Sequence, residues 1–139
     1  MIVLDTNVLS ELTRVSPSAE VFDWIAGQPR SSIFTTAITQ AEMLYGIELM
    51  TKGRRRTAFL AEVDQMLKED FADRILPFDS FAAVSFGWIY ASRQAMGKRI
   101  LQADAQIAAI VHSRGAALAT RNVRDFEHCG IKVLNPWAQ

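Results

Sequence analysis

Four carboxylates occupy positions from which they could act on a substrate together, Asp5, Glu42, Asp104 and Asp125. Oxygen ligands of this kind suit Mg²⁺ and Mn²⁺, whereas clustered carboxylates without a cation repel one another. A bound divalent ion removes that repulsion, lowers the pKa of a bound water and offsets the charge of a phosphate. The four residues therefore predict metal-assisted hydrolysis, of phosphodiesters, of phosphate monoesters or of other bonds.

Asp104 is the most informative of the four because it is an acid where a helical pattern favours an apolar side chain. Residues 102–114 predict a helix. Asp104 lies on the same stripe of that helix as Ile107 and Val111. A carboxylate turned toward a core is costly unless it is paired, protonated or bound to a metal. The alternative is a first-turn acid that complements the helix dipole or caps the helix.

Asp5 and Glu42 each follow a predicted strand. Asp5 comes directly after the apolar run 2–4, and open α/β sheets bind ligands outside the carboxyl ends of their strands. Glu42 is expected in the first helical turn after the strand predicted at 33–35, on the same rim. Both acids have a structural alternative. Asp5 could be a helix N-cap, and Glu42 could be the acid of a capping box over residues 39–42.

The fourth carboxylate, Asp125, lies in a polar segment after the strand predicted at 117–119. Asn122 in the same segment carries no charge and suits a cap or a water-orienting role. Asp125 is about one helical turn further along and could approach the same crevice. Its alternative is an exposed salt bridge to Arg121 or Arg124, worth under about 1 kcal/mol.

Short apolar runs and helical patterns must position these side chains. The runs are mostly not alternating, which is typical of strands covered on both faces, and they lie at 2–4, 33–35, 75–76, 117–119 and 132–134. Helical patterns follow at 8–12, 21–26, 41–49, 59–67, 79–97 and 102–114, with Asp79 as the N-cap of the fifth. The alternation predicts one α/β domain over residues 1–139, with a short, mostly parallel central sheet flanked by helices.

Composition narrows the class of protein. Half of the 139 residues are hydrophobic and 22% are charged, as in globular proteins. The formal net charge is zero, so nucleic-acid binding would need a local basic patch. The single cysteine, Cys129, excludes an internal disulfide framework and a multi-cysteine zinc site. Without a signal-peptide pattern or a run of roughly 18 apolar residues, a cytoplasmic protein with no membrane contact is expected.

Four motifs, in their order and separation, resemble those of PIN-domain proteins, specifically the VapC-type toxins of VapBC toxin–antitoxin pairs and their FitB-like branch. The motifs are Leu4-Asp5-Thr6-Asn7, Ala37 to Glu42 with Tyr45-Gly46, Ala103 to Ala109, and Ala119 to Phe126. The likeness covers nearly the whole chain, from Ile2 to Trp137. It implies a PIN-like α/β/α sandwich whose acids bind Mg²⁺, or Mn²⁺ in its place, and which hydrolyses RNA as an endoribonuclease.

The resemblance also assigns roles to residues. By motif, Asp5, Glu42 and Asp104 are catalytic, metal-site residues, and Asp125 takes the fourth place because Asn122 is an amide. Polar supports for the carboxylates or a bound water would be Thr6, Asn7, Thr120 and Asn122. Basic side chains near the same rim could neutralise RNA phosphates or be ordinary solvated residues, namely Arg14, Lys98, Arg99, Arg121 and Arg124.

The partners implied are a second copy of the chain and a small antitoxin with a DNA-binding domain. The antitoxin tail would block the acidic crevice, and operator DNA would be bound only through the antitoxin. A homodimer also agrees with the composition, because a small domain is not expected to bury all of Met43, Ile47, Met50, Met66 and the tryptophans. Two alternatives remain, a small metal-dependent phosphomonoesterase and a non-catalytic or weakly catalytic module acting through antitoxin-dependent DNA binding.

Overall fold

All five predicted strands are present and form one sheet with the order β3-β2-β1-β4-β5. The computed structural model describes residues 1–138. The strands are β1 (Ile2–Leu4), β2 (Ile33–Thr36), β3 (Ile75–Leu76), β4 (Ala117–Ala119) and β5 (Lys132–Leu134). Every neighbouring pair is parallel, so the carboxyl ends of the strands meet at one edge of the sheet. The expectation of a short, mostly parallel sheet is confirmed.

Helices connect the strands, as the alternating pattern predicts. Within residues 1–138 the α-helices are α1 (Thr6–Leu12), α2 (Ala19–Ala26), α3 (Ala37–Glu48), α4 (Arg54–Gln65), α5 (Ser80–Ala95) and α6 (Gln102–Ser113). Shorter helical turns are η1 (Arg30–Ser32), η2 (Met66–Asp70), which extends α4, and η3 (Val123–Phe126). None of the helices in this part of the chain is long and apolar enough to cross a membrane.

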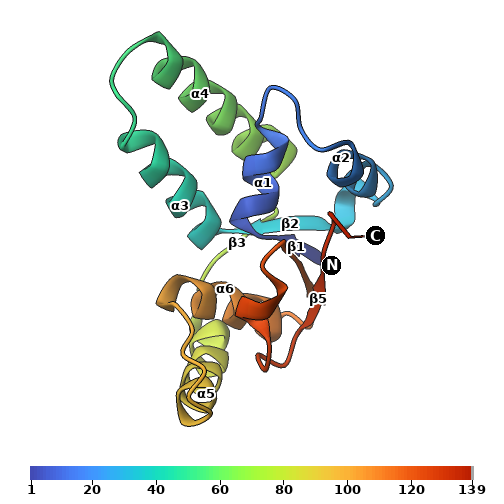
Figure 1. Cartoon of the computed structure of the whole chain (residues 1–139), viewed down its shortest axis with the longest axis vertical. Helices are drawn as coiled ribbons and strands as arrows, with labels where there is room; N and C mark the ends of the chain where they lie inside the picture. The colour runs from blue at the N-terminus through green and yellow to red at the C-terminus, as the bar shows by residue number, and fades with distance from the viewer. Residues whose placement is uncertain (139) are drawn as a thin grey trace.

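The sheet separates two hydrophobic cores. Successive residues of a strand point to opposite faces, so Val3 packs with α5 and α6 while Leu4 packs with α1 to α4. Leu118 and Ala119 of β4 divide in the same way. In Figure 1 α1 to α4 lie above the sheet, and α5 and α6 lie below it. The α/β/α sandwich predicted from the sequence is therefore confirmed.

The start of α3 differs from the sequence expectation. Thr36, the last residue of β2, is also the N-cap of α3, and its hydroxyl accepts a 3.1 Å hydrogen bond from the Thr39 N–H. Glu42 therefore lies in the second turn, and the capping box over residues 39–42 is wrong. The chain enters the helix directly from the strand, which leaves no loop for a cap at Thr39. The predicted cap at Asp79 is confirmed, because its carboxylate accepts from the Ala82 N–H at 2.9 Å.

The expectation that not all of the large apolar side chains are buried is confirmed, because Trp88 is exposed, but Met43 and Ile47 are buried. Met43 and Ile47 are 7% and 1% exposed, because α3 packs this face against α1 and α4. Large apolar side chains are instead exposed along α5, where Phe81, Val84 and Trp88 are 75%, 77% and 51% exposed. Their spacing of three and four residues places them on one face of the helix.

Candidate active site

Asp5 lies where β1 ends and α1 begins. Its own N–H bonds the Ala119 carbonyl at 2.9 Å, which ties the end of β1 to the end of β4. The carboxylate accepts a 2.8 Å bond from the Thr6 N–H, a 2.7 Å bond from the Thr120 hydroxyl and a 3.3 Å bond from the Asn7 amide. Asp5 is thus the N-cap of α1 and also lies at the carboxyl-end rim of the sheet, so its capping role does not exclude its position at the rim.

The environment of Asp5 opposes its negative charge. Burial raises the pKa of Asp5 above its usual range, and the charges of Glu42 and Asp125 raise it further. The hydrogen bonds from Thr120 and Thr6 act in the opposite direction, because they stabilise the ionised carboxylate. The side chain is therefore held rigidly in a place where a nearby cation would favour the charged form.

Thr6 connects Asp5 to the helix on the other side of the rim. Its hydroxyl lies 2.9 Å from Glu42 Oε1 and 3.1 Å from the Thr39 hydroxyl, both within hydrogen-bond distance. Glu42 itself is exposed and lines a cavity together with Asp5 and Thr6. The predicted supporting role of Thr6 has a geometric basis, since it fixes one oxygen of Glu42 from the first turn of α1.

Asp104 lies in the first turn of α6 at the margin of the lower core. Ala105, Ile107 and Ala108 around it are fully buried, and Asp104 is half-buried. Within residues 1–138 its carboxylate accepts no hydrogen bond and forms no ion pair. Burial raises the pKa of Asp104 to about 6, and the charges of Asp5, Asp125 and Glu42 contribute to that rise. Its position on the buried stripe agrees with the sequence pattern.

Asp125 approaches the other carboxylates from η3. It is exposed, and its charge raises the pKa of both Asp5 and Asp104. In the described part of the chain it forms no ion pair with Arg121 or Arg124, so the salt-bridge alternative is wrong. The Arg121 guanidinium lies over the Trp137 ring instead, 5.0 Å from its centroid.

Asn122 precedes η3 but does not cap it with its side chain. Its backbone N–H donates to the Thr120 hydroxyl at 3.1 Å, and that hydroxyl in turn donates to Asp5. Asn7 also contacts the Thr120 hydroxyl, at 3.2 Å, and its carbonyl accepts from the Arg121 N–H at 3.2 Å. The polar residues after β4 are thus connected to Asp5 rather than to a helix end.

Two cavities meet at Asp104, and together they form the acidic cleft. One has a volume of about 470 Å³ and is lined by Asp5, Thr6, Asn7, Ser10, Glu11, Arg14, Glu42, Asp104 and Asn122. The other has a volume of about 320 Å³ and is lined by Tyr90, Arg93, Arg99, Ile100, Leu101, Gln102, Asp104 and Asp125. Asp104 lines both cavities, so it stands between Asp5 and Glu42 on one side and Asp125 on the other.

The donor set of the acidic cleft fits a hard divalent cation. Apart from the Tyr90 phenol, its ionisable oxygen ligands are carboxylates, and within residues 1–138 neither a histidine nor a cysteine lines it. As the side chains lie, no three acids, histidines or cysteines within residues 1–138 are close enough to hold one ion. The mutual effects on pKa nevertheless show that these acids interact, and Mg²⁺ usually binds through one or two carboxylates and several waters. The Asp104 carboxylate, which accepts no hydrogen bond within residues 1–138, is a group that a cation would stabilise.

The basic residues predicted near the rim divide into two sets. Arg14 lines the larger cavity, held by a 3.3 Å ion pair with Glu11, and Arg99 lines the smaller one. Lys98, Arg121 and Arg124 line neither. The structure therefore brings two of the five candidate phosphate contacts to the acidic cleft.

Sequence reasoning missed two buried charged residues beside the cleft. Glu11 is 6% exposed, accepts a 3.0 Å bond from the Ser18 N–H and orients Arg14. Arg93, in the last turn of α5, is 5% exposed and donates to three backbone carbonyls. No signal in the sequence distinguishes either from an ordinary solvated residue at a helix end.

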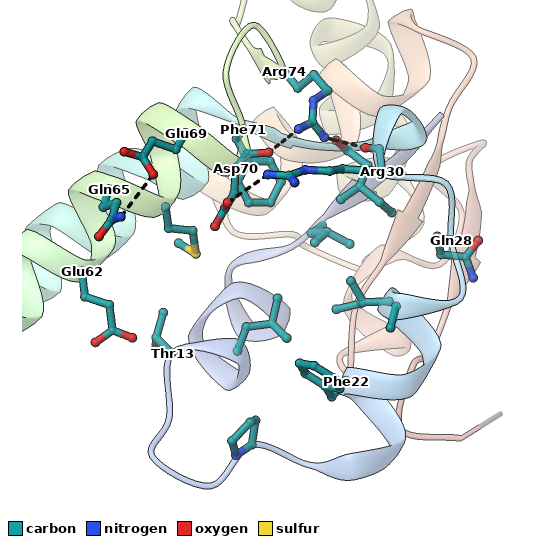
Figure 2. Close-up of a pocket in the computed structure, with 17 residues that line it drawn as sticks. Thr13, Phe22, Gln28, Arg30, Glu62, Gln65, Glu69, Asp70, Phe71 and Arg74 are labelled. Carbon is teal, nitrogen blue, oxygen red and sulfur yellow. Dashed lines mark hydrogen bonds and ion pairs between the residues drawn. The ribbon is translucent and has the colours of Figure 1, made fainter.

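A third cavity lies on the upper layer, away from these acids. It has a volume of about 780 Å³ and lies between α1, α2 and the end of α4 with η2 (Figure 2). Its apolar lining includes Leu12, Phe22, Ile25, Met66 and Phe71. Carboxylates stand at its edge on α4 and η2, namely Glu62, Glu69 and Asp70. We call this cavity the apolar groove.

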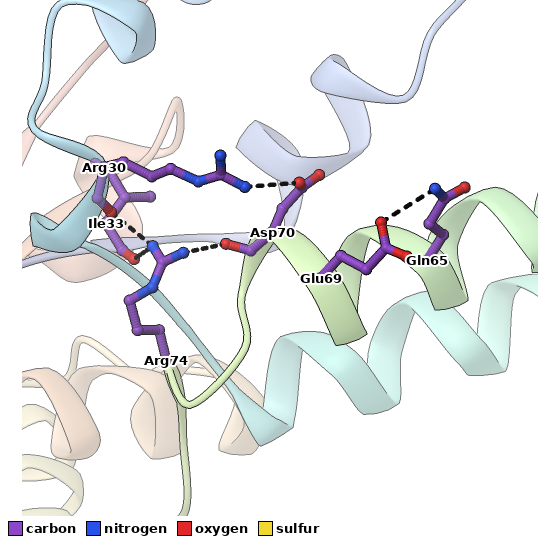
Figure 3. Close-up of polar contacts among 6 residues, drawn as sticks. All are labelled: Arg30, Ile33, Gln65, Glu69, Asp70 and Arg74. Carbon is purple, nitrogen blue, oxygen red and sulfur yellow. Dashed lines mark hydrogen bonds and ion pairs between the residues drawn. The ribbon is translucent and has the colours of Figure 1, made fainter.

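Polar contacts close one end of the apolar groove (Figure 3). Arg30 forms a 3.1 Å ion pair with Asp70. Arg74 donates to the carbonyls of Arg30 and Ile33 at 2.6 and 2.7 Å, and also to the Asp70 carbonyl. These contacts join η1 to the end of η2. The groove has the lining of a protein-binding surface, with an apolar floor and a charged edge.

Comparison with known proteins identifies the family. The PIN domain family model matches residues 2–132. The chain is 40% identical to the VapC ribonuclease Y4jK of Sinorhizobium fredii over 137 residues, 99% of this chain and 98% of the other. It is 35% identical to the toxin FitB of Neisseria gonorrhoeae over 137 residues, 99% of each chain.

The fold agrees with these sequence matches. The structure of the FitAB complex bound to the IR36 DNA fragment contains a chain that is 35% identical, with a TM-score of 0.93, and the match covers 100% of this chain and 97% of that chain. The parallel five-stranded sheet, the acidic rim and the matched motifs therefore lead to one conclusion. The chain belongs to the PIN-domain family and, within it, to the VapC-type proteins of the FitB-like branch.

Proposed function

We propose that the protein is a Mg²⁺-dependent endoribonuclease, with Mn²⁺ as a substitute, and that it acts as the toxin of a type II toxin–antitoxin pair. The observation that carries this proposal is the Asp104 carboxylate, which is half-buried, accepts no hydrogen bond from residues 1–138 and is repelled by Asp5, Asp125 and Glu42. RNA as the substrate is supported by relatives such as Y4jK, which is named a VapC ribonuclease.

Asp5, Glu42, Asp104 and Asp125 would hold the ion. When bound, Mg²⁺ supplies a water of lowered pKa and offsets the negative charge of the scissile phosphate. Thr120 and Asn7 keep the Asp5 carboxylate in one orientation, and Thr6 does the same for Glu42. Asp104 loses its proton near neutral pH, so its carboxylate becomes available for binding where cellular pH lies above its pKa of about 6.

Substrate binding is assigned to the basic residues of the acidic cleft. Arg14 lines its larger cavity and Arg99 lines its smaller one, so they could contact phosphates on either side of Asp104. Such contacts would position the RNA backbone without reading its bases. In a chain whose formal net charge is zero, these two side chains place individual positive charges at the acidic cleft.

The test is cleavage of total RNA by the purified protein with and without Mg²⁺, with Asp104→Asn as the paired variant. We expect cleavage only by the wild type with metal. Turnover of a chromogenic phosphomonoester without cleavage of RNA would instead establish the phosphomonoesterase. Calorimetric titration that detects no Mn²⁺ binding would favour the non-catalytic module.

An antitoxin is proposed as the partner: part of its tail would block the acidic cleft, and the apolar groove would hold an apolar stretch of the same tail. The solved FitAB complex bound to a DNA fragment supports an antitoxin and, through it, operator DNA. The groove offers an apolar floor, and the carboxylates Glu62, Glu69 and Asp70 at its edge suit basic side chains of the tail (Figure 2).

A homodimer is proposed as well. Phe81, Val84 and Trp88 present an exposed apolar face on α5, which nothing else in residues 1–138 covers. Exposed apolar surface of this kind usually marks an interface. The proposal is tested by sedimentation of the wild type and of Phe81→Glu across a concentration series. A wild type that stays monomeric throughout would contradict it.

A further inference from the structure

Arg93 holds together two segments that carry residues of the acidic cleft. Its Nε donates to the Lys98 carbonyl at 2.6 Å, in the connection that leads into α6 and Asp104. One terminal nitrogen donates to the Asp125 carbonyl at 2.9 Å and to the Glu127 carbonyl at 2.8 Å, on either side of Phe126. The same nitrogen lies 3.5 Å from Cys129 Sγ.

The surroundings of Arg93 set it apart from an ordinary helix-end arginine. The residue is 5% exposed, and within the described chain it forms no salt bridge with a carboxylate. A buried cation is costly unless its hydrogen-bonding groups are satisfied, so backbone carbonyls must replace the water that it loses. A planar guanidinium can donate to several carbonyls at fixed angles, which the single ammonium of a lysine cannot reproduce.

Few other side-chain contacts hold η3, the turn that carries Asp125, in place. Its preceding residue, Asn122, provides no side-chain cap, and the turn is only four residues long. Phe126 is buried and anchors the centre of η3 to the lower core. The buried Phe126 ring sets how close η3 lies to the lower core, but η3 could still rotate about that ring. The hydrogen bonds from Arg93 to the carbonyls of residues 125 and 127 oppose this rotation and so fix the direction in which Asp125 points.

We propose that Arg93 is a positioning residue that holds η3 so that Asp125 faces Asp104 across the smaller cavity of the acidic cleft. This inference rests on the proposed function, because it assigns Arg93 to the metal-binding arrangement of that site. Arg93 itself lines the same cavity as both acids.

The test is a double-mutant cycle on Mn²⁺ binding, measured by calorimetry without RNA. We expect Arg93→Gln to weaken binding by about 10- to 100-fold, as is typical when an outer partner of a metal ligand is lost. If Arg93 acts through Asp125, Arg93→Gln combined with Asp125→Asn should bind within about twofold of Asp125→Asn alone. Losses that multiply in the double variant, or wild-type binding by Arg93→Gln, would overturn the proposal.

Two further variants keep the test decisive. Arg54→Gln removes an exposed positive charge at the start of α4 and should leave Mn²⁺ binding unchanged. If Arg93→Gln does not fold, Arg93→Lys keeps the charge with fewer carbonyl contacts and should still weaken binding. A folded Arg93→Lys variant with wild-type affinity would count against the fixed-angle contacts.

Amide hydrogen exchange separates this inference from the proposed function. In Arg93→Gln or Arg93→Lys, the amide hydrogens of residues 122–129 should exchange faster than in the wild type, whether or not metal is bound. The exchange rates in α3 should not change. A wild type that binds no Mn²⁺ would refute the proposed function, and exchange would then decide the role of Arg93. Unchanged protection at residues 122–129 would overturn that role even in a protein that cleaves RNA.

Discussion

Replacing Asp104 with asparagine should stabilise the metal-free protein while abolishing RNA cleavage. The pKa of Asp104 rises from 3.8 to about 6 in the folded protein, so ionising it costs free energy at neutral pH. A shift of this size corresponds to about 3 kcal/mol. Because Asp104 is only half-buried, solvent screens part of that cost, and roughly 1–2 kcal/mol is expected. For a domain of this size the melting temperature should rise by roughly 3–8 °C.

The sign of the pH dependence follows from the direction of the shift. A folded-state pKa above the unfolded value means that the folded protein binds the proton more tightly than the unfolded chain does. The wild type is therefore penalised as pH rises from about 4 to above 6, where the carboxylate ionises. Asp104→Asn removes the penalty, so its advantage should be full at pH 7.5 and should shrink toward pH 4.

The assay is thermal unfolding in EDTA at pH 7.5 and pH 4.5, with Asp23→Asn, an exposed acid of α2, as the control. Added Mg²⁺ should then raise the melting temperature of the wild type but not that of Asp104→Asn. An Asp104→Asn protein less stable than the wild type at pH 7.5, or equally stabilised at both pH values, would refute the electrostatic reasoning. Wild-type cleavage by this variant would remove Asp104 from the site.

Three other substitutions test separate parts of the proposal. Glu42→Gln should not lower the melting temperature, because Glu42 does not cap α3, but it should weaken Mn²⁺ binding in calorimetry. Normal RNA cleavage by this variant would remove Glu42 from the site. Asp125→Asn should raise the Mn²⁺ concentration needed for half-maximal cleavage. Asn122→Ala should instead cost only about 0.5–1 kcal/mol of stability in urea unfolding. If Asp125→Asn and the wild type depend equally on metal, Asp125 is not part of the site and three carboxylates remain in it. Phe22→Glu, at an exposed position of the apolar groove, should weaken antitoxin binding at least about tenfold in a titration. Cleavage of RNA by the variant alone should not change. Unchanged antitoxin affinity would place the tail elsewhere.

The strands were predictable nearly to the residue because each is a short apolar run covered on both faces. The start of α3 was not, since Thr36 ends a strand and caps a helix at once, and a threonine three residues later offered an equally good local pattern. Local propensity cannot decide between the two caps, because the choice depends on where β2 pairs with β1 and β3.

The acids of the candidate site were also predictable in part. Asp5 could be predicted because it directly follows a strand, and Asp104 because it lies on the buried stripe of a helix. Both are local features of the sequence. Arg93 left no such mark, because its partners are carbonyls of residues 98, 125 and 127, and no side-chain pattern encodes them. The burial of Met43 and Ile47 likewise depends on α1 and α4 closing over α3.

The bond between Thr120 and Asp5 joins residues 115 positions apart in the chain. A growing polypeptide that has not yet emerged as far as β4 has neither the Thr120 hydroxyl nor the Ala119 carbonyl that hold Asp5 in place. Chains are synthesised at about 5–20 residues per second, so several seconds separate the synthesis of Asp5 from that of the residues that hold it. A chain that stops before β4 therefore leaves Asp5 without these two partners, so the rim around Asp5 depends on synthesis through residue 120.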